Sequence, residues 1–118
     1  MTLVLALTGA SGALAAERFL ARSPWPVTLV ASVWGRRVYE REVGPFAALA
    51  ERAAAVFADD DLAAPIASGS VPTRGMVAIP CTSGILARVA AGLGDTLIAR
   101  AAHCHLKERR PLILCVLE

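Results

Sequence analysis

A short apolar strand that runs through a tight Gly-Ala-Ser-Gly turn into a helix restricts the fold of this chain more than any other feature. Thr2–Leu7 is almost entirely apolar, and Ser11–Arg22 has the Ala, Leu, Glu and Arg content of a helix that ends at Ser23-Pro24. The turn between them, residues 9–12, contains only small residues. A strand, a tight turn and a helix in this order form the first part of a βαβ unit, which predicts parallel strands.

The rest of the chain continues the alternation of strands and helices. Strands this apolar belong inside a sheet that is covered on both faces, not at its edges. The sequence therefore predicts a doubly wound α/β domain, with a parallel sheet between two layers of helices. The further strands are expected at Pro26–Ser32, Gly75–Pro80 and Pro111–Val116. The further helices are expected at Trp34–Glu42, Phe46–Phe57, Thr82–Ala91 and from a cap at Asp95 to about Glu108, with a polar loop over Asp59–Thr73.

The composition is that of one soluble domain with a single core. The chain has 118 residues, of which 56% are hydrophobic and 19% charged, and its net charge is +2. That charge gives no electrostatic reason to bind nucleic acid or a membrane surface, and no apolar run reaches the ~18 residues of a membrane span. The three cysteines, at positions 81, 104 and 115, are an odd number without metal-type spacing, which favours a reducing cytoplasm over a disulfide framework.

Small and hydroxyl-bearing residues follow three of the predicted strands. The run Gly9-Ala10-Ser11 opens the first helix, whose unpaired N–H groups attract anions, so it can hold a phosphate; a plain tight turn is the alternative. Ser32 ends the second strand, and Thr82 and Ser83 follow the third. One such hydroxyl is ordinarily a helix cap, but three strand ends at one edge of a parallel sheet favour a shared anion or cofactor site.

Two further segments carry polar groups that a ligand could use. The loop Ala67-Ser68-Gly69-Ser70 is either a flexible turn or a binding loop. Lys107, the only lysine, begins a basic run at the end of the last helix, where the helix dipole stabilises cations; a compact ammonium also suits a phosphate leaving group. Cys81 follows Pro80 and has no histidine near it in sequence, so we expect a buried structural thiol and not a nucleophile.

Taken in order along the chain, these pieces resemble the UbiX/Pad-type flavin prenyltransferases, a group of flavin-binding proteins. The most specific match is the run Leu106-Lys107-Glu108-Arg109-Arg110-Pro111-Leu112. The resemblance spans nearly the whole chain and implies a flavodoxin-like, Rossmann-like fold in three αβα layers. The other matching stretches are Thr8–Gly12, Ser32, Ala67–Ser70, Gly75–Val77 leading to Pro80-Cys81, and Leu97–Ala102.

The resemblance also implies an activity. Members of that family bind FMN between the subunits of a dodecamer and join a dimethylallyl group, taken from dimethylallyl phosphate, to N5 and C6 of reduced FMN. The prenylated FMN then serves a partner decarboxylase. For this chain the resemblance implies a cytoplasmic, homo-oligomeric flavoprotein with FMN as cofactor, dimethylallyl phosphate as substrate and no metal.

The expected site residues follow from the resemblance, position by position. Cations stabilise the departing phosphate as the allylic C–O bond breaks, and carboxylates move protons as the second ring bond closes. The residues expected at the prenyl-phosphate end and in proton transfer are Glu42, Ser68, Lys107 and Glu118, with Arg100 beside them. The residues expected to bind the cofactor are Gly9, Ala10, Ser11, Ser32, Thr82, Ser83, Gly84, Ile85 and Arg100.

Three departures from the family pattern bear on that activity. Leu117 stands where the family usually has arginine, and Gly84-Ile85 where it often has Lys-Thr. The family also continues past the position of Glu118, so the expected single domain, residues 1–118, lacks the family's C-terminal part. The alternative is therefore a catalytically incomplete FMN-binding or assembly module of the same fold. A decarboxylase of peptidyl or amino-thiol substrates is disfavoured, because such proteins have a histidine soon after the first strands and the first here is His103.

Overall fold

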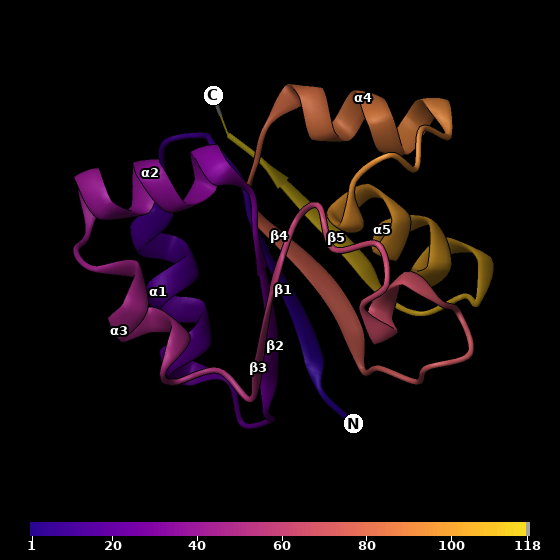
Figure 1. The fold of residues 1–118 in the computed structure, drawn as a ribbon, viewed down its shortest axis with the longest axis horizontal. Helices are drawn as coiled ribbons and strands as arrows, with labels where there is room; N and C mark the ends of the chain where they lie inside the picture. Colours follow the sequence, from indigo (N-terminus) through magenta and orange to yellow (C-terminus); the bar gives the residue numbers. More distant parts are fainter. Residues whose placement is uncertain (118) are drawn as a thin grey trace.

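A computed structural model describes residues 1–117 and shows a parallel β-sheet between two helical layers (Figure 1). Across the sheet the strand order is β3-β2-β1-β4-β5, and every neighbouring pair is parallel. This is the order of the first five strands of a Rossmann-type sheet, and the predicted doubly wound, three-layer αβα fold is confirmed. Within the described range the strands are β1 (Leu3–Leu7), β2 (Val27–Ala31), β3 (Ala55–Ala58), β4 (Gly75–Cys81) and β5 (Leu112–Val116).

The helices cover both faces of the sheet because the crossovers that start from β1 and from β4 run in opposite directions. One face carries α1 (Ala13–Arg22), α2 (Val33–Glu42) and the short α3 (Phe46–Ala50). The other face carries α4 (Ser83–Ala91), α5 (Leu97–Lys107) and the single 3₁₀ turn η1 (Pro65–Ala67). Among residues 1–117, no helix has the length and apolar character needed to cross a membrane.

The strands are apolar on both sides because each side packs against helices. Leu5, Leu7 and Leu29 are fully buried in a cluster with residues of α1, α2 and α3. Val4 and Val30, which point to the opposite face, are fully buried in a second cluster with residues of α4 and α5. Truncating one such side chain to alanine costs about 2–5 kcal/mol of stability, so the strand ends are held on a rigid support.

The helix expected over Phe46–Phe57 is wrong in its second half. Helix α3 ends at Ala50, and Ala55–Ala58 forms the edge strand β3, which pairs with β2. Burial alternates along β3, and Phe57 packs against the core of the α4 and α5 face. An alanine-rich stretch has helical propensity, but the exposed edge of β2 and the burial of one aromatic ring outweigh it over these four residues.

The expectation that every strand is too apolar for an edge is also wrong, because β5 lies at the edge opposite to β3. Leu112 and Leu114 pack against the core on the α5 face. Ile113 points to the other face and is 55% exposed. The apolar sequence of β5 therefore reflects burial of one face only in the part of the chain that the structure describes.

The expected cap of helix α5, Asp95, is wrong, because Thr96 caps this helix. The Thr96 hydroxyl oxygen accepts a hydrogen bond from the Ala99 N–H at 3.2 Å. The Asp95 carboxylate instead receives the Arg88 guanidinium at 2.6 Å. Threonine and aspartate are both common N-cap residues, but the Asp95 carboxylate is paired with Arg88 and so does not cap the helix.

Candidate functional site

The candidate site lies where the chain leaves the sheet after β1 and after β4. These two strands are neighbours, yet the chain passes from β1 to α1 on one face and from β4 to α4 on the other (Figure 1). In doubly wound sheets, this change of direction opens a crevice outside the carboxyl ends of the strands, and ligands bind there. The segments at this crevice are residues 8–12 and residues 80–85.

Thr8 joins the two segments. Its hydroxyl donates a hydrogen bond to the Pro80 carbonyl at 2.7 Å and accepts one from the Thr82 N–H at 3.0 Å, and the residue is 1% exposed. Buried hydroxyls with both a donor and an acceptor partner hold their neighbours in one arrangement. The residue roles drawn from the sequence omit Thr8; its only signal is a hydroxyl residue at the end of an apolar strand.

Two glycines let the backbone pass closely through this turn. A Cβ atom on Gly9 would lie 2.6 Å from the Cβ of Trp34, so any other residue there would push α2 away. Gly12 has a φ of 112°, a left-handed conformation that glycine adopts without steric cost, and it caps α1. Helix α1 therefore starts at Ala13, two residues later than expected, which leaves its first N–H groups directed out of the sheet edge.

Glu42, the last residue of α2, places its carboxylate on those N–H groups. Oε1 accepts from the Gly12 and Ala13 N–H groups at 3.0 and 3.1 Å, and Oε2 accepts from the Ser11 hydroxyl at 2.7 Å. The Ser11 hydrogen bond, followed by those from Gly12 and Ala13, lowers the pKa of Glu42 below its usual value. The structure thus brings Glu42 and Ser11 together and shows that this turn holds an anion, here a carboxylate of the same chain.

Ser32 and Thr82 both serve as helix caps at this edge. Ser32 Oγ accepts from the Gly35 N–H at 2.9 Å at the start of α2, and Thr82 Oγ1 accepts from the Ile85 N–H at 3.1 Å at the start of α4. Each hydroxyl keeps its own hydrogen as a donor. The cap function expected for a single hydroxyl is therefore present, and it leaves these residues able to donate to a ligand.

The remaining residues predicted on α4 differ in what they offer. Ser83 and Gly84 are exposed on the first turn of the helix. Ile85 is buried in the core, and its N–H is already bonded to Thr82. Within this chain Ile85 thus presents neither its side chain nor its N–H to a ligand at the sheet edge.

Ser68 and Lys107 lie at the amino ends of the strands, opposite to the carboxyl ends where Ser11 lies. Ser68 precedes β4, and Lys107 ends α5 just before β5, whereas the turn at Ser11 follows β1. The seven residues of β4 span six steps of about 3.3 Å, so the two ends of the strand are about 20 Å apart. One copy of the chain therefore does not bring Ser68 and Lys107 to the Ser11 turn.

Arg100 lies between these extremes, on the first half of α5. Its guanidinium donates to the Gly94 carbonyl at 3.2 Å, in the connection between α4 and α5, and its side chain is exposed. The start of α5 is near the carboxyl end of β3, since the Leu97 N–H donates to the Asp59 carbonyl at 2.7 Å. Glu118, the last predicted acid, lies outside the described residues.

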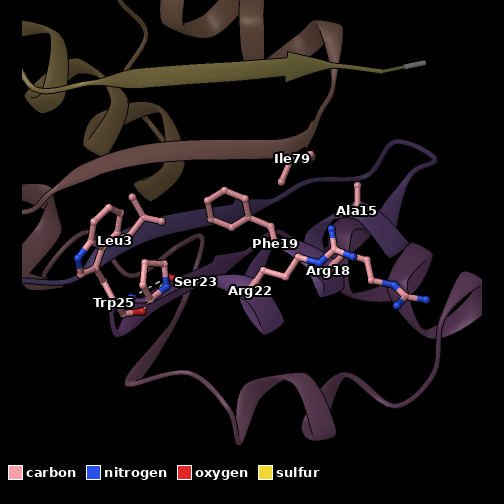
Figure 2. A pocket seen from close by; sticks show the side chains of 9 residues that line it. Leu3, Ala15, Arg18, Phe19, Arg22, Ser23, Trp25 and Ile79 are labelled. Carbon is pink, nitrogen blue, oxygen red and sulfur yellow. Dashed lines mark hydrogen bonds between the residues drawn. The ribbon is translucent and has the colours of Figure 1, made fainter.

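Among the hollows that the described residues border, two differ in their relation to the predicted site. One, of about 330 Å³, is bordered at the carboxyl ends of β2 and β3 by Arg36 and Asp59, and burial raises the pKa of Asp59 above its usual value. The other, of about 420 Å³, is mainly apolar and contains none of the predicted site residues; Figure 2 shows Phe19 along it, between Trp25 and Arg18. In residues 1–117 no cluster of three histidine, cysteine or acidic side chains is arranged to hold a metal ion.

Comparison with known proteins assigns the chain to a family. The family model described as Flavoprotein matches residues 1–117. The chain belongs to the flavoprotein family. The flavin prenyltransferase UbiX of Deinococcus radiodurans is 48% identical over 120 residues, which are 98% of this chain and 62% of that protein. The resemblance to the UbiX-type flavin prenyltransferases is thereby confirmed.

Solved structures agree with this assignment. AnUbiX (PadA1), crystallised in complex with FMN and dimethylallyl pyrophosphate, superposes with a TM-score of 0.95 at 36% identity, over 99% of this chain and 64% of that one. A dodecameric FMN-dependent UbiX-like decarboxylase from Escherichia coli O157:H7 superposes with a TM-score of 0.94 at 36% identity, over 100% of this chain and 67% of that one. The chain spans somewhat less than two thirds of the length of the first curated relatives it matches.

Proposed function

We propose that this chain binds FMN at the carboxyl edge of its sheet and acts as a flavin prenyltransferase that uses dimethylallyl phosphate. The observation that carries this proposal is the turn at the start of α1, where a hydroxyl and two N–H groups converge on an anion. That turn belongs to a fold with a TM-score of 0.95 to a protein crystallised with FMN and dimethylallyl pyrophosphate.

The turn fits the phosphate of a nucleotide-type cofactor by its own geometry. The N–H groups of Gly12 and Ala13 point at a bound carboxylate, and the positive end of the α1 dipole favours any anion at that place. When bound and reduced, FMN supplies the N5 and C6 atoms that receive the dimethylallyl group. The residues proposed to hold it are Gly9, Ala10, Ser11, Ser32, Thr82 and Ser83, with Gly84 and Arg100 as further positions from the family pattern.

Glu42 is proposed to hold or accept a proton at the Ser11 hydroxyl. The two groups are 2.7 Å apart, within the distance that proton transfer requires. The hydrogen bonds that lower the pKa of Glu42 keep it ionised at neutral pH, so it is an acceptor in the resting state. A phosphate placed on the same N–H groups has to displace this carboxylate or share the helix terminus with it.

The leaving phosphate is proposed to meet Ser68 and Lys107 of a second copy of the chain. Cations and hydroxyls stabilise the charge that develops on a departing phosphate. Since both residues lie at the edge opposite to Ser11, a homo-oligomer is needed to bring them to the flavin. The E. coli neighbour is described as a dodecamer, which supports an assembly of this kind. We also propose a cytoplasmic protein whose prenylated FMN serves a partner decarboxylase.

A second candidate is an FMN-binding or assembly module of the same fold that does not catalyse prenyl transfer. The separation of Ser68 and Lys107 from the Ser11 turn favours it, because a chain that stays monomeric has only the cofactor part of the site. The two candidates share FMN binding and differ in the second ligand.

The decisive experiment uses the full 118-residue chain. FMN and riboflavin are titrated by flavin fluorescence, the oligomeric state is measured by light scattering, and reduced FMN is then mixed anaerobically with dimethylallyl phosphate. We expect FMN binding, an oligomer, and a flavin product heavier by one dimethylallyl group in the mass spectrum. Lys107→Ala should keep FMN binding and lose the product.

The alternatives are separated by which step fails. FMN binding without product, in a chain that is oligomeric, selects the non-catalytic module. A chain that cannot be loaded with FMN refutes both candidates. Full turnover in Lys107→Ala would mean that Lys107 only stabilises the end of α5 and has no part in prenyl transfer.

A further inference from the structure

The loop that carries Ser68 is held by side chains from the end of α5. Arg110 donates from Nη2 to the Gly69 carbonyl at 2.9 Å and from Nη1 to the Val71 carbonyl at 3.0 Å. The two acceptors are two residues apart in the loop. A planar guanidinium spans them in a fixed geometry that a lysine ammonium does not reproduce, so Arg110 fixes the path of the backbone between Ser68 and Val71.

The end of α5 is shaped to bring Arg110 to this position. The Arg110 N–H donates back to the His105 carbonyl at 2.9 Å, and the Arg109 N–H donates to the Leu106 carbonyl at 3.3 Å. Arg109 has a φ of 56°, a left-handed conformation that non-glycine residues disfavour. This tight reversal turns the chain across the loop before β5 begins.

His105 holds the other end of the loop. It is 1% exposed, and its Nδ1 lies 2.6 Å from the Ala101 carbonyl, which can only accept; Nδ1 therefore carries the hydrogen. In the neutral ring Nε2 is then an acceptor, and the Thr73 hydroxyl donates to it at 2.6 Å. Thr73 is itself buried, so this bond anchors the loop where it enters β4.

The loop so held lies against Lys107. A Cβ atom on Gly69 would be 3.2 Å from Lys107 Nζ, so the ammonium lies close to the loop backbone. The hydroxyls of Ser68 and Ser70 are 2.9 Å apart on the same loop, and both residues are exposed. Two hydroxyls and one ammonium therefore lie together on one exposed surface.

We propose that Arg110 and His105 are positioning residues, which hold the loop of residues 68–73 against Lys107 so that its hydroxyls and the ammonium reach one phosphate group together. The identity of that phosphate, the phosphate of dimethylallyl phosphate, rests on the proposed function. The hydrogen bonds that join Arg110 and His105 to this loop, called the clamp below, belong to the fold and can be tested without any ligand.

The test compares Arg110→Lys and Thr73→Val with a control, Arg88→Lys. Arg110→Lys keeps the charge but reaches one carbonyl at most, and Thr73→Val removes one hydroxyl at nearly constant shape. Arg88→Lys makes the same change of side chain in a surface ion pair, that of Arg88 with Asp95 at 2.6 Å, far from the loop in sequence. Hydrogen exchange of the amides of residues 68–71 and 73 is measured in all three variants and in the wild type.

Loss of the clamp should raise exchange in this loop by about tenfold or more in Arg110→Lys and Thr73→Val, with wild-type rates in Arg88→Lys. In the assembled, FMN-loaded protein the KM for dimethylallyl phosphate should rise by about tenfold, the value that one lost charge-assisted hydrogen bond implies, while FMN affinity stays within about twofold. A merely structural role would lower stability without this selective change in KM.

The two proposals fail in different ways. If the wild type makes prenylated FMN and both variants keep its KM and its loop exchange, the positioning role is overturned and the function stands. If the wild type makes no product, the function fails, and loop exchange alone decides the clamp: faster exchange supports it and unchanged exchange overturns it. Should Arg110→Lys not fold, Thr73→Val decides by the same criteria.

Discussion

The Glu42 carboxylate accepts a 2.7 Å hydrogen bond from the Ser11 hydroxyl and sits on the N-terminus of α1. The residue that sequence comparison assigns to proton transfer and the turn assigned to the cofactor phosphate are therefore one constellation. A carboxylate and a phosphate want the same two N–H groups, because both are anions that the helix terminus stabilises. We therefore expect the Glu42 carboxylate to compete with a bound phosphate for these N–H groups.

Glu42→Gln should tighten the binding of FMN but not of riboflavin. The neutral amide competes less well for the α1 terminus, so a phosphate gains about three- to tenfold in affinity, while riboflavin has no phosphate to respond. Both affinities are read from flavin fluorescence. Product formation should fall in the same variant, because the proton acceptor at Ser11 is lost. Equal changes for FMN and riboflavin would place the phosphate elsewhere, at Ser32 or Thr82.

Ser11→Asp should expel the phosphate. The new carboxylate lies beside Glu42 and on the path to the Gly12 N–H, so FMN affinity should fall by at least about tenfold while riboflavin affinity changes less. Circular dichroism should show an unchanged fold, because Ser11 is exposed. Unchanged FMN affinity refutes the placement of the phosphate at this turn.

Thr8→Val should destabilise the fold by about 1–3 kcal/mol, since it leaves the Pro80 carbonyl and the Thr82 N–H without their buried partner. Urea unfolding measures the loss. The matched control is Thr28→Val, whose hydroxyl has a single partner, Thr2, and whose loss should cost less. Equal costs in the two variants would show that Thr8 does not link the strand ends.

The sequence indicates which site residues meet at the carboxyl ends of the strands, but not how the whole site is arranged. Glycine and hydroxyl residues after apolar strands report local geometry, and parallel strands bring them to one edge, so Ser11, Ser32 and Thr82 could be grouped in advance. The structure places Lys107 beside Gly69, in the loop that carries Ser68, while the shared function of Lys107 and Ser68 stays a prediction. Their separation from Ser11 is a property of strand direction that no motif encodes.

Three other features depended on tertiary contacts. Residues 55–58 become a strand because β2 offers an unpaired edge, which the alanine-rich local sequence does not indicate. Thr96 caps α5 because Arg88 engages Asp95. Thr8 is a lone hydroxyl in an apolar segment, and only the proximity of residues 80–82 gives it a function.

Arg109→Gly should stabilise the chain by about 1 kcal/mol. Arg109 occupies the left-handed region at a φ of 56°, where a non-glycine residue is strained and glycine is not. Glu108→Gly is the control, because Glu108 has a φ of −87° and gains nothing from glycine, so its stability should fall slightly. Thermal unfolding of the three proteins gives the comparison. A loss of stability in Arg109→Gly would mean that its side chain contributes more than the strain it carries.

The last prediction concerns pH and the buried ring of His105. Burial lowers the pKa of His105 below its usual value; the Ala101 hydrogen bond opposes this, and Arg110 adds a smaller lowering effect. In the unfolded chain the same ring takes up a proton near the ordinary value, about 6.5. Below that pH the unfolded state therefore binds more protons than the folded state, and the free energy of unfolding falls as pH falls. The fall stops only below the pKa of the folded state.

Urea unfolding of the wild type at pH 7.5, 6.5, 5.5 and 5.0 should show this loss, with a slope of at most about 1.4 kcal/mol per pH unit for one proton. His105→Gln keeps a polar group toward Thr73 but cannot titrate, so its stability should depend less on pH over the same interval, even if it is lower at pH 7.5. His103→Gln, on the same helix, controls for the substitution itself. An identical pH dependence in wild type and His105→Gln would show that His105 takes up its proton equally well in the folded and the unfolded chain.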